Sequence, residues 1–352
     1  MKKNKEVIIL ICTLSVLILV AGGVLIYKYV TRDKGTNNTL ETNTEANENN
    51  EELVVDKKQP QTFKGTDRPI AVMIDNHSGA WPQASLNQAD IVYEIVVEGG
   101  ETRLMAVFKG KNVDKIGPVR SSRHYFLDYA LENDAIYVHY GWSPQAESDI
   151  GTLGVNNING ITESTSSFWR VKDKTSPHNV LTSTEKILKI AERNKYRTTS
   201  QKESVLKYSA DEIQLESENS TVANKVTIPH SNLQTVQYQY NPEQKTYTRY
   251  ARGKVQTDYV TKENIKTKNI IITYCDNYEL TDTENKGRQG LKNIGTFDGY
   301  YITNGKAMKI KCTKSARDAQ TIYKDLQGNV INVNDGNTFI NICPTDAKVV
   351  IE

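Results

Sequence analysis

The chain has 352 residues, of which 38% are hydrophobic and 24% charged, and its formal net charge is +2. This length can bury one large core or two smaller ones. The balanced charge, with no basic stripe interleaved with aromatic residues, excludes a typical nucleic-acid-binding protein, and four cysteines are too few for a disulfide scaffold of this size.

Residues 1–30 predict an N-terminal membrane anchor. Lysines at positions 2, 3 and 5 precede an uncharged and mainly apolar run from Val7 to Tyr27, which as a helix would span about 30 Å. The basic N-terminus and the long polar segment after the run favour a single-pass protein of the cell membrane, with the bulk of the chain extracytoplasmic. A cleaved signal peptide is the alternative, but the apolar run continues past the small residues at 21–23.

The remainder of the chain predicts an α+β protein behind this transmembrane helix. Residues 31–66 are polar enough to form a disordered linker. Residues 67–198 predict a mixed α/β domain, because they combine apolar runs at 70–74 and 136–138 with helix signals at about Ser122–Asn133, Ser143-Pro144 and Ser183–Ala191. Residues 199–223 are expected to be a connector, and the short alternating runs in 224–352 predict a β-rich domain.

Within the first domain, residues 89–108 predict a β-hairpin with a two-residue turn at Gly99-Gly100. This turn would place Glu98 opposite Glu101 and Val96 opposite Arg103. One face would be a core face made of Ile91, Tyr93, Ile95, Val97, Leu104, Ala106 and Phe108. The other would carry Glu94, Glu98, Glu101 and Arg103. Facing glutamates repel each other, which indicates a cation beside them; a solvated outer face is the alternative.

The segment IGPVRSSRH (116–124) is the clearest candidate binding motif. Arg120 and Arg123 flank the expected start of a helix, close to the Ser121 hydroxyl. Guanidinium groups, hydroxyls and the free amides of a first helical turn together predict an anion site for a phosphate or a carboxylate. The alternative is that these arginines pair with the glutamates of the hairpin and brace the fold.

Histidines supply further candidates. His77 and His139 each follow an apolar strand, and if those strands are parallel neighbours, both histidines lie at one sheet edge. Asp75, Asn76 and His178 are candidates for the same edge. The chain has no HxH or HExxH pair, no phosphate-binding glycine loop and no dinucleotide motif, so we predict neither a metal site nor a cofactor.

Three cysteines follow the apolar run. Cys312 and Cys343 fall in late strands of the β-rich domain, and the sequence favours them as a disulfide pair. Cys275 would then be free and buried.

Several segments resemble the YerB-like family of bacterial extracytoplasmic lipoproteins. The motifs are RPIAVMIDNH (68–77), ADIVYEIVVEGGETR (89–103), IGPVRSSRHYFLDYA (116–130), VHYGWSPQA (138–146) and SPHNV (176–180), with a looser similarity at NGKAMKIKC (304–312) and GNVINVNDGNTFINI (328–342). The resemblance implies a two-part, outward-facing and membrane-tethered protein, and it implies no established reaction. Many members carry a lipobox cysteine, whereas Cys12 follows Leu10-Ile11, so this chain is expected to be anchored by its helix rather than by lipid.

We therefore expect a protein of the cell envelope whose first domain binds an anionic or glycan ligand, or a protein partner. The candidate binding residues are Asp75, Asn76, His77, Glu98, Glu101, Arg103, Arg120, Ser121, Arg123, His139 and His178. Two alternatives remain open: a hydrolase or lyase acting on cell-wall glycan with Glu98 as acid/base, and a non-catalytic scaffold of a membrane-protein complex. The expected partners are the membrane, a cell-wall glycan or anion, and a membrane protein, but no nucleic acid.

Overall fold

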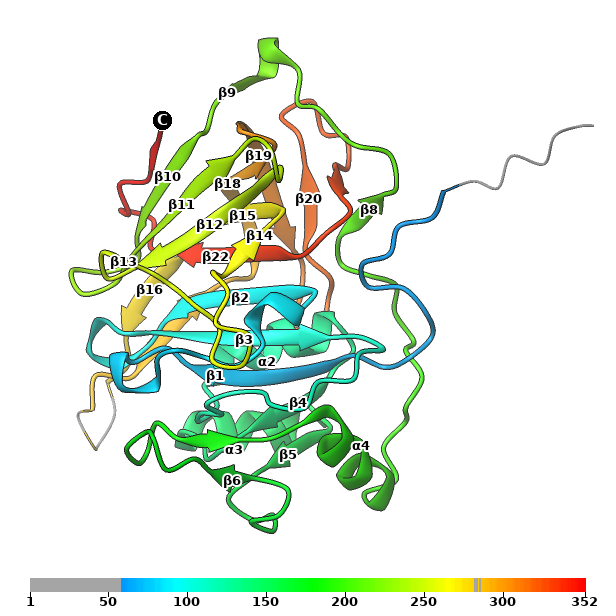
Figure 1. Ribbon diagram of the computed structural model, residues 1–352, viewed down its shortest axis with the longest axis vertical. Coiled ribbons are helices and arrows are strands. Elements are labelled where there is room, and N and C mark those ends of the chain that lie inside the picture. The colour runs from blue at the N-terminus through cyan, green and yellow to red at the C-terminus, as the bar shows by residue number, and fades with distance from the viewer. Residues whose placement is uncertain (1–57, 282–283, 285) are drawn as a thin grey trace, which may run out of the picture. The chain divides into compact units, whose positions relative to one another are not determined.

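One long sheet takes strands from both halves of the chain in the computed structural model, which describes residues 58–281, 284 and 286–352 (Figure 1). Its order is β20 (Ile322–Lys324), β19 (Lys306–Lys314), β18 (Gly295–Thr303), β15 (Asn269–Tyr274), β22 (Thr338–Cys343), β2 (Ile91–Val96), β3 (Thr102–Phe108), β1 (Ile70–Asp75), β4 (Ile136–His139) and β5 (Asn157–Asn159), with β9 (Ser220–Val222) beside β19. The late strand β22 runs parallel to both β15 and β2. The two predicted domains therefore share one hydrogen-bonded sheet.

Smaller sheets and three α-helices complete the described part of the chain. A six-stranded sheet contains β13 (Lys254–Val255), β12 (Thr246–Ala251), β11 (Thr235–Asn241), β10 (Lys225–Pro229) and β23 (Val350–Ile351), with β14 (Lys266–Thr267) on β12. Two-stranded pairs are β16 (Asp276–Glu279) with β17 (Gln289–Lys292), β21 (Asn332–Asn334) with β8 (Lys207–Ser209), and β6 (Trp169–Arg170) with β7 (Val180–Leu181). The helices are α2 (His124–Glu132), α3 (Pro144–Thr152) and α4 (Thr184–Arg193), and the short 3₁₀ turns are η1 (Ser78–Ala80), η2 (Leu86–Gln88), η3 (Glu98–Gly100) and η4 (Ser217–Asn219).

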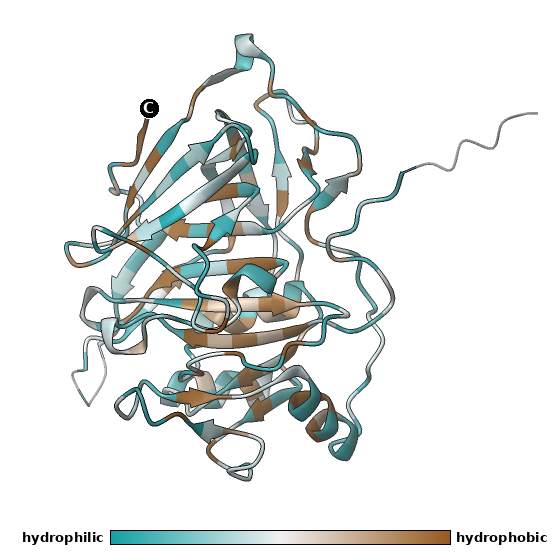
Figure 2. Ribbon diagram, viewed as in Figure 1, coloured by the Kyte–Doolittle hydropathy of each residue, from teal (hydrophilic) through white to brown (hydrophobic). Residues whose placement is uncertain are grey.

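The inner strands β22, β2, β3 and β1 of the long sheet are buried on both faces. On one face Phe339 of β22 packs edge-on against Tyr238 of the six-stranded sheet, with ring centroids 6.1 Å apart. On the other face Tyr93 of β2 packs against Tyr129 of α2, with ring centroids 5.0 Å apart. Because β1, β2 and β3 have no solvent-exposed face, their sequences are apolar almost throughout, as Figure 2 shows for these strands.

The hairpin register differs from the prediction by one residue. The connection is the three-residue turn η3, in which Gly99 and Gly100 have φ angles of +66° and +73°. In consequence Ile95 faces Arg103 and Val96 faces Thr102. A slip of one residue moves a whole strand's side chains to opposite faces, so the predicted two-residue turn and the predicted faces are wrong. Glu94 and Arg103, expected together on a polar face, lie on opposite faces of a buried sheet.

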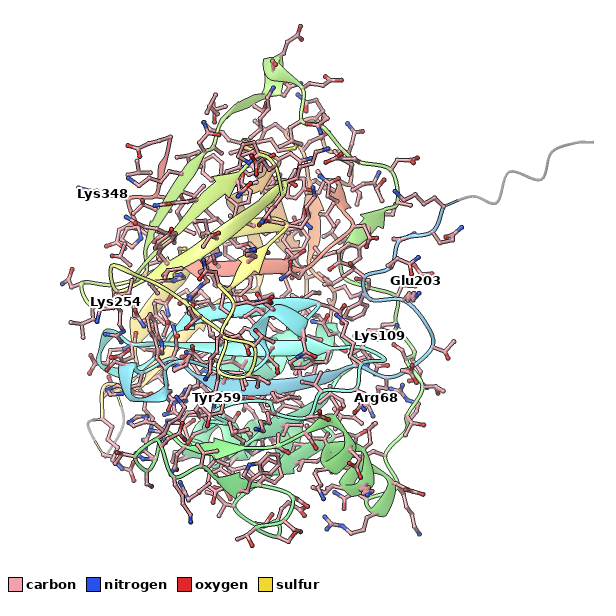
Figure 3. All side chains as sticks on the ribbon, in the orientation of Figure 1. Arg68, Lys109, Glu203, Lys254, Tyr259 and Lys348 are labelled. Atoms are coloured by element: carbon pink, nitrogen blue, oxygen red, sulfur yellow. The ribbon has the colours of Figure 1, made fainter. Side chains whose placement is uncertain are left out.

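The folded unit begins before Arg68 and includes the predicted connector. The backbone amides of Gln61 and Thr62 each donate to the Asp335 carboxylate at 2.8 Å, and Phe63 is buried. Arg68, labelled in Figure 3, donates from Nε to the Asp134 carbonyl at 2.7 Å. The predicted anchor and most of the predicted linker lie outside the described residues. Among the residues that are described, no helix is long and apolar enough to cross a membrane.

Helix starts follow the capping signals in two of three cases. The hydroxyls of Ser143 and Ser183 accept backbone hydrogen bonds at the starts of α3 and α4, as their sequence positions predict. Helix α2 begins only at His124, after an extended Arg123 that makes no side-chain cap. The segment before α2 forms backbone hydrogen bonds with the ends of β1 and β4. These hydrogen bonds hold Arg120 in place, although it is not at the start of a helix.

The predicted Cys312–Cys343 disulfide is wrong. Both cysteines are buried and free, and Cys275 is likewise buried and free, as expected. Cys312 lies on β19 and Cys343 on β22, with β18 and β15 between them. Three strand spacings amount to about 14 Å, which is far beyond the reach of a disulfide.

A buried ion pair joins the two halves between the sheets. Arg249 of β12 donates from Nη2 to Glu94 Oε2 of β2 at 2.6 Å, and both side chains are shielded from solvent. Burial by itself would raise the pKa of Glu94, but Arg249, His230 and the Thr102 hydroxyl hold that pKa below its ordinary value. Two nitrogens of Arg249, Nε and Nη1, have no hydrogen-bond partner among the described residues. The charge of Glu94 is therefore the main compensation for burying this guanidinium.

Candidate functional site

The first wall of the candidate site is the end of β1. Asp75 Oδ2 lies 2.7 Å from Nδ1 of His178 and 3.2 Å from Nε of Arg120, while its Oδ1 accepts the backbone N–H of His77 at 3.0 Å. The rings of His77 and His178 stack with centroids 4.3 Å apart and planes only 11° apart. One carboxylate thus orders two histidines and one arginine that come from three separate segments.

Arg103 lies next to this wall on β3, paired in register with Asp75. Its Nη1 donates to the Ser121 carbonyl at 2.6 Å, and the residue is only 6% exposed. Among the described residues, no carboxylate forms an ion pair with it within 4.0 Å, in contrast to Arg120 and Arg123. Burial, together with the positive charge of Arg123, lowers the pKa of Arg103 to about 10. The fold therefore holds a desolvated guanidinium beside two further guanidiniums.

The second wall comes from the hairpin turn. The Glu98 carboxylate accepts two hydrogen bonds from Arg123, at Nε and at Nη2, the latter at 2.8 Å. Glu101 pairs with Arg252, which comes from the turn after β12. Burial would raise the pKa of Glu98, but the hydrogen bonds and charge of Arg123, with Arg103 nearby, hold that pKa below its ordinary value. A carboxylate held ionised in this way is poorly suited to donate a proton, which disfavours Glu98 as a catalytic acid.

The two walls enclose a cavity of about 560 Å³. It is lined by Asp75, His77, Val97, Glu98, Glu101, Thr102, Arg103, Arg120, Arg123, Trp142, Ser143, His178, Lys286 and Arg288. Among the described residues, five lining side chains are cationic and three are carboxylates, which leaves an excess of two positive charges. Other cavities of about 510 and 760 Å³ occur on the described surface, but their linings contain at most one arginine.

Eight of the eleven residues singled out in the sequence line this cavity, and three do not. The hydroxyl of Ser121 donates to the Tyr140 carbonyl at 3.0 Å and does not cap a helix, because α2 begins only after Arg123. Asn76 is buried and donates to Glu94 and Thr102. His139, on the parallel neighbour of β1, is buried as well. Its two ring nitrogens lie 2.8 Å from the Gly141 carbonyl and 3.0 Å from Asn157.

Sequence reasoning missed five polar or aromatic members of the lining, one of which is Thr102 on β3. Trp142 and Ser143 precede α3 and line the cavity. Because Ser143 was interpreted from the sequence as the cap of that helix, it was not considered a binding residue. Lys286 and Arg288 belong to the β16–β17 connection, where both pair with Glu284. Two basic residues in a polar turn are too common to predict a binding site from sequence. Only the packing of distant segments shows that these two residues line the cavity.

Acid sensitivity follows from the Glu98–Arg123 pair. Because the folded-state pKa of Glu98 is below its unfolded value, its charge stabilises the fold above the unfolded pKa, and this contribution is lost as the pH falls through the folded pKa. We expect wild-type stability to fall more steeply than that of Glu98→Gln when urea unfolding is compared between pH 7 and pH 3. Parallel curves for the two proteins would contradict this account.

The arrangement defines a two-part α+β protein with an arginine-lined cavity between the end of β1 and the hairpin turn, and the chain belongs to the DUF3048 family. The N-terminal domain of that family, described as a protein of unknown function, matches residues 57–197, and its C-terminal domain matches residues 226–340. A relative is the "Putative lipoprotein YerB" of Bacillus subtilis (strain 168), which is 30% identical over 285 residues, or 79% of this chain and 81% of the relative.

A solved structure supports the same fold. The crystal structure of the YerB protein from Bacillus subtilis is 29% identical and superposes with a TM-score of 0.71, covering 81% of this chain and 94% of that chain. The YerB-like resemblance seen in the motifs is therefore confirmed over both parts of the fold.

Proposed function

We propose that this protein is a membrane-tethered, extracytoplasmic protein of the cell envelope that binds an anionic ligand in the arginine-lined cavity. The extracytoplasmic location is supported by the lipoprotein name of its relative and by the apolar run near the N-terminus. The observation that carries the binding proposal is Arg103, which is 6% exposed, lines the cavity and has no ion-pair partner among the described residues.

Physical chemistry favours an anion at this position. Gathering three guanidiniums costs repulsion and desolvation, and a buried charge is normally offset by an opposite charge or by hydrogen bonds. Asp75 and Glu98 are each already engaged by a different arginine. A bound phosphate or carboxylate group would supply acceptor oxygens to Arg103 and to Arg120, which contacts Asp75 through Nε, in the forked geometry that guanidinium prefers.

The test is anion binding by the full-length chain in detergent micelles. Isothermal titration calorimetry with inorganic phosphate, and separately with acetate, should show binding of at least one anion. The variant Arg103→Met should weaken that binding at least about tenfold, because a charge-assisted hydrogen bond is worth roughly 1.5–3 kcal/mol. Co-sedimentation of the wild type and Arg103→Met with purified peptidoglycan tests whether the anionic group belongs to wall glycan.

A matched control separates the cavity from general charge effects. Arg193→Met removes an exposed arginine of α4 that pairs with Glu163 and lies outside the cavity lining, so this variant should leave the affinity unchanged. Thermal unfolding should show Arg103→Met folded, since it removes a desolvated charge. Equal affinities of the wild type and folded Arg103→Met, or no anion binding by the wild type, would refute the proposal.

A further inference from the structure

We propose that the cavity hydrolyses a phosphomonoester, with His178 Nε2 as the general base and Asp75 as the residue that positions it. This inference rests on the proposed function, because the arginines have to hold the phosphate group before His178 can act on it. It is carried by the contacts of the two stacked histidines, which fix where each ring bears its proton.

The tautomer of His178 follows from its contact with Asp75. The Asp75 carboxylate faces Arg120 at 3.2 Å and accepts the His77 backbone N–H at 3.0 Å, so both of its oxygens are used as acceptors. His178 Nδ1, 2.7 Å from Oδ2, must then carry the hydrogen. In the neutral ring this leaves the lone pair on Nε2. An aspartate that fixes a histidine in this tautomer is the arrangement that prepares a general base.

The neighbouring ring has the opposite arrangement. His77 Nδ1 accepts the backbone N–H of Gly79 at 3.1 Å, so a neutral His77 carries its hydrogen on Nε2. Two stacked rings that line one cavity thus offer a base on His178 and a hydrogen-bond donor on His77. Gly79 packs closely against both rings, because a Cβ added at Gly79 would lie 3.0 Å from His178 Cδ2 and 3.3 Å from His77 Nδ1.

Charge selects the class of substrate. Among the described residues, the lining and its ion-pair partners comprise six cations and four carboxylates, because Arg252 pairs with Glu101 and Glu284 pairs with Lys286 and Arg288. This positive balance favours the dianion that a phosphomonoester forms at neutral pH. A carboxylate carries one charge and only two oxygens, whereas a phosphoryl group has three non-bridging oxygens for the forks of Arg103 and Arg120 and for His77 Nε2. Phosphodiesters carry a single charge and should be poorer substrates.

The reaction balances without a further reagent. The oxygen of a water attacks phosphorus while His178 Nε2 takes one of the water protons, and the ester P–O bond breaks. The other water proton remains on the new P–OH group, and the His178 imidazolium returns its proton to the leaving alkoxide. The products are an alcohol and hydrogen phosphate. Arg103 and Arg120 stabilise the negative charge on the phosphoryl oxygens during the step.

The experiment uses full-length protein in detergent micelles with p-nitrophenyl phosphate and EDTA, which suppresses contaminating metal-dependent phosphatases. Wild type should release p-nitrophenolate faster than buffer, and faster from this monoester than from bis(p-nitrophenyl) phosphate. His178→Gln, which can still donate to Asp75, should lower kcat about 10²-fold or more, with KM and the calorimetric affinity for inorganic phosphate within about twofold. Asp75→Asn, which favours the wrong tautomer, should also lower kcat.

The outcomes separate this inference from the proposed function. Phosphate binding without hydrolysis by the wild type overturns the inference and leaves the binding proposal standing, whereas failure to bind any anion overturns both. Hydrolysis by His178→Gln at the wild-type rate, or preference for the diester, also overturns it. His124→Gln, at a histidine outside the cavity lining, is the matched control and should keep full activity. If a variant fails to fold, the rates of the wild type with the monoester and the diester still test the inference.

Discussion

Glu94→Gln is expected to lower the free energy of unfolding by about 3–5 kcal/mol, because breaking a buried ion pair leaves the partner's charge without compensation. The stranded partner is Arg249, whose guanidinium is fully buried and whose Nε and Nη1 already lack partners among the described residues. Since domains are typically stable by only 5–15 kcal/mol, this single change removes a large share of the stability. Urea unfolding followed by tryptophan fluorescence measures it.

A double-mutant cycle tests the cause. Glu94→Gln combined with Arg249→Met removes both charges, so the double variant should be more stable than either single variant. Glu185→Gln is the matched control, because Glu185 pairs with Lys189 on the exposed face of α4 and should leave stability unchanged within error. Additive losses in the double variant would show that the two side chains do not depend on each other.

Gly299→Ala is expected to be as damaging, for reasons of space alone. Gly299 lies on β18 opposite Thr273 of β15, and an added Cβ would lie 2.1 Å from the Ile272 carbonyl oxygen. The backbone cannot move aside as the tip of a side chain can, so β18 would have to separate from β15, and the hydrogen bonds between these two strands would be lost. We expect a loss of about 4 kcal/mol or more in the free energy of unfolding.

Gly151→Ala is expected to have the opposite effect on the free energy of unfolding. Gly151 lies within α3, and an added Cβ there meets no heavy atom within 4 Å. Alanine is the better helix former and restricts the unfolded chain, so this variant should gain about 0.5–1 kcal/mol. If both alanine variants shifted the urea midpoint equally, close backbone approach at Gly299 would not be the reason for its glycine.

Local signals in the sequence account for much of the fold. The apolar run at 70–74 is β1, and the serine caps at 143 and 183 start α3 and α4, because periodicity and capping depend on residues within one or two turns. These local signals could not predict the hairpin register. Gly99-Gly100 fits a two-residue turn and a three-residue turn equally well, and β22, which pairs with β2 from the far end of the sequence, buries the strand in either case.

The candidate site, too, could be predicted from the sequence only in part. Residue types indicated which side chains belong to binding chemistry, and eight of them line one cavity. His139 satisfied the same strand-end rule, yet its ring is fully used by Gly141 and Asn157. Burial and hydrogen-bond partners distinguish it from His178, and neither is written in the spacing of histidines along the chain.

The sequence by itself determined the order of strands and helices, the polar character of the segments around Asp75 and Arg120, and the membership of the YerB-like family, because each depends on residues that are neighbours in the chain. Only the tertiary structure decided which charges meet. It joined Glu94 to Arg249 across 155 positions and left Arg103 facing the cavity without an ion-pair partner among the described residues. The reason is physical: electrostatic energies depend on distance and on exclusion of water, and the packing of distant segments sets both.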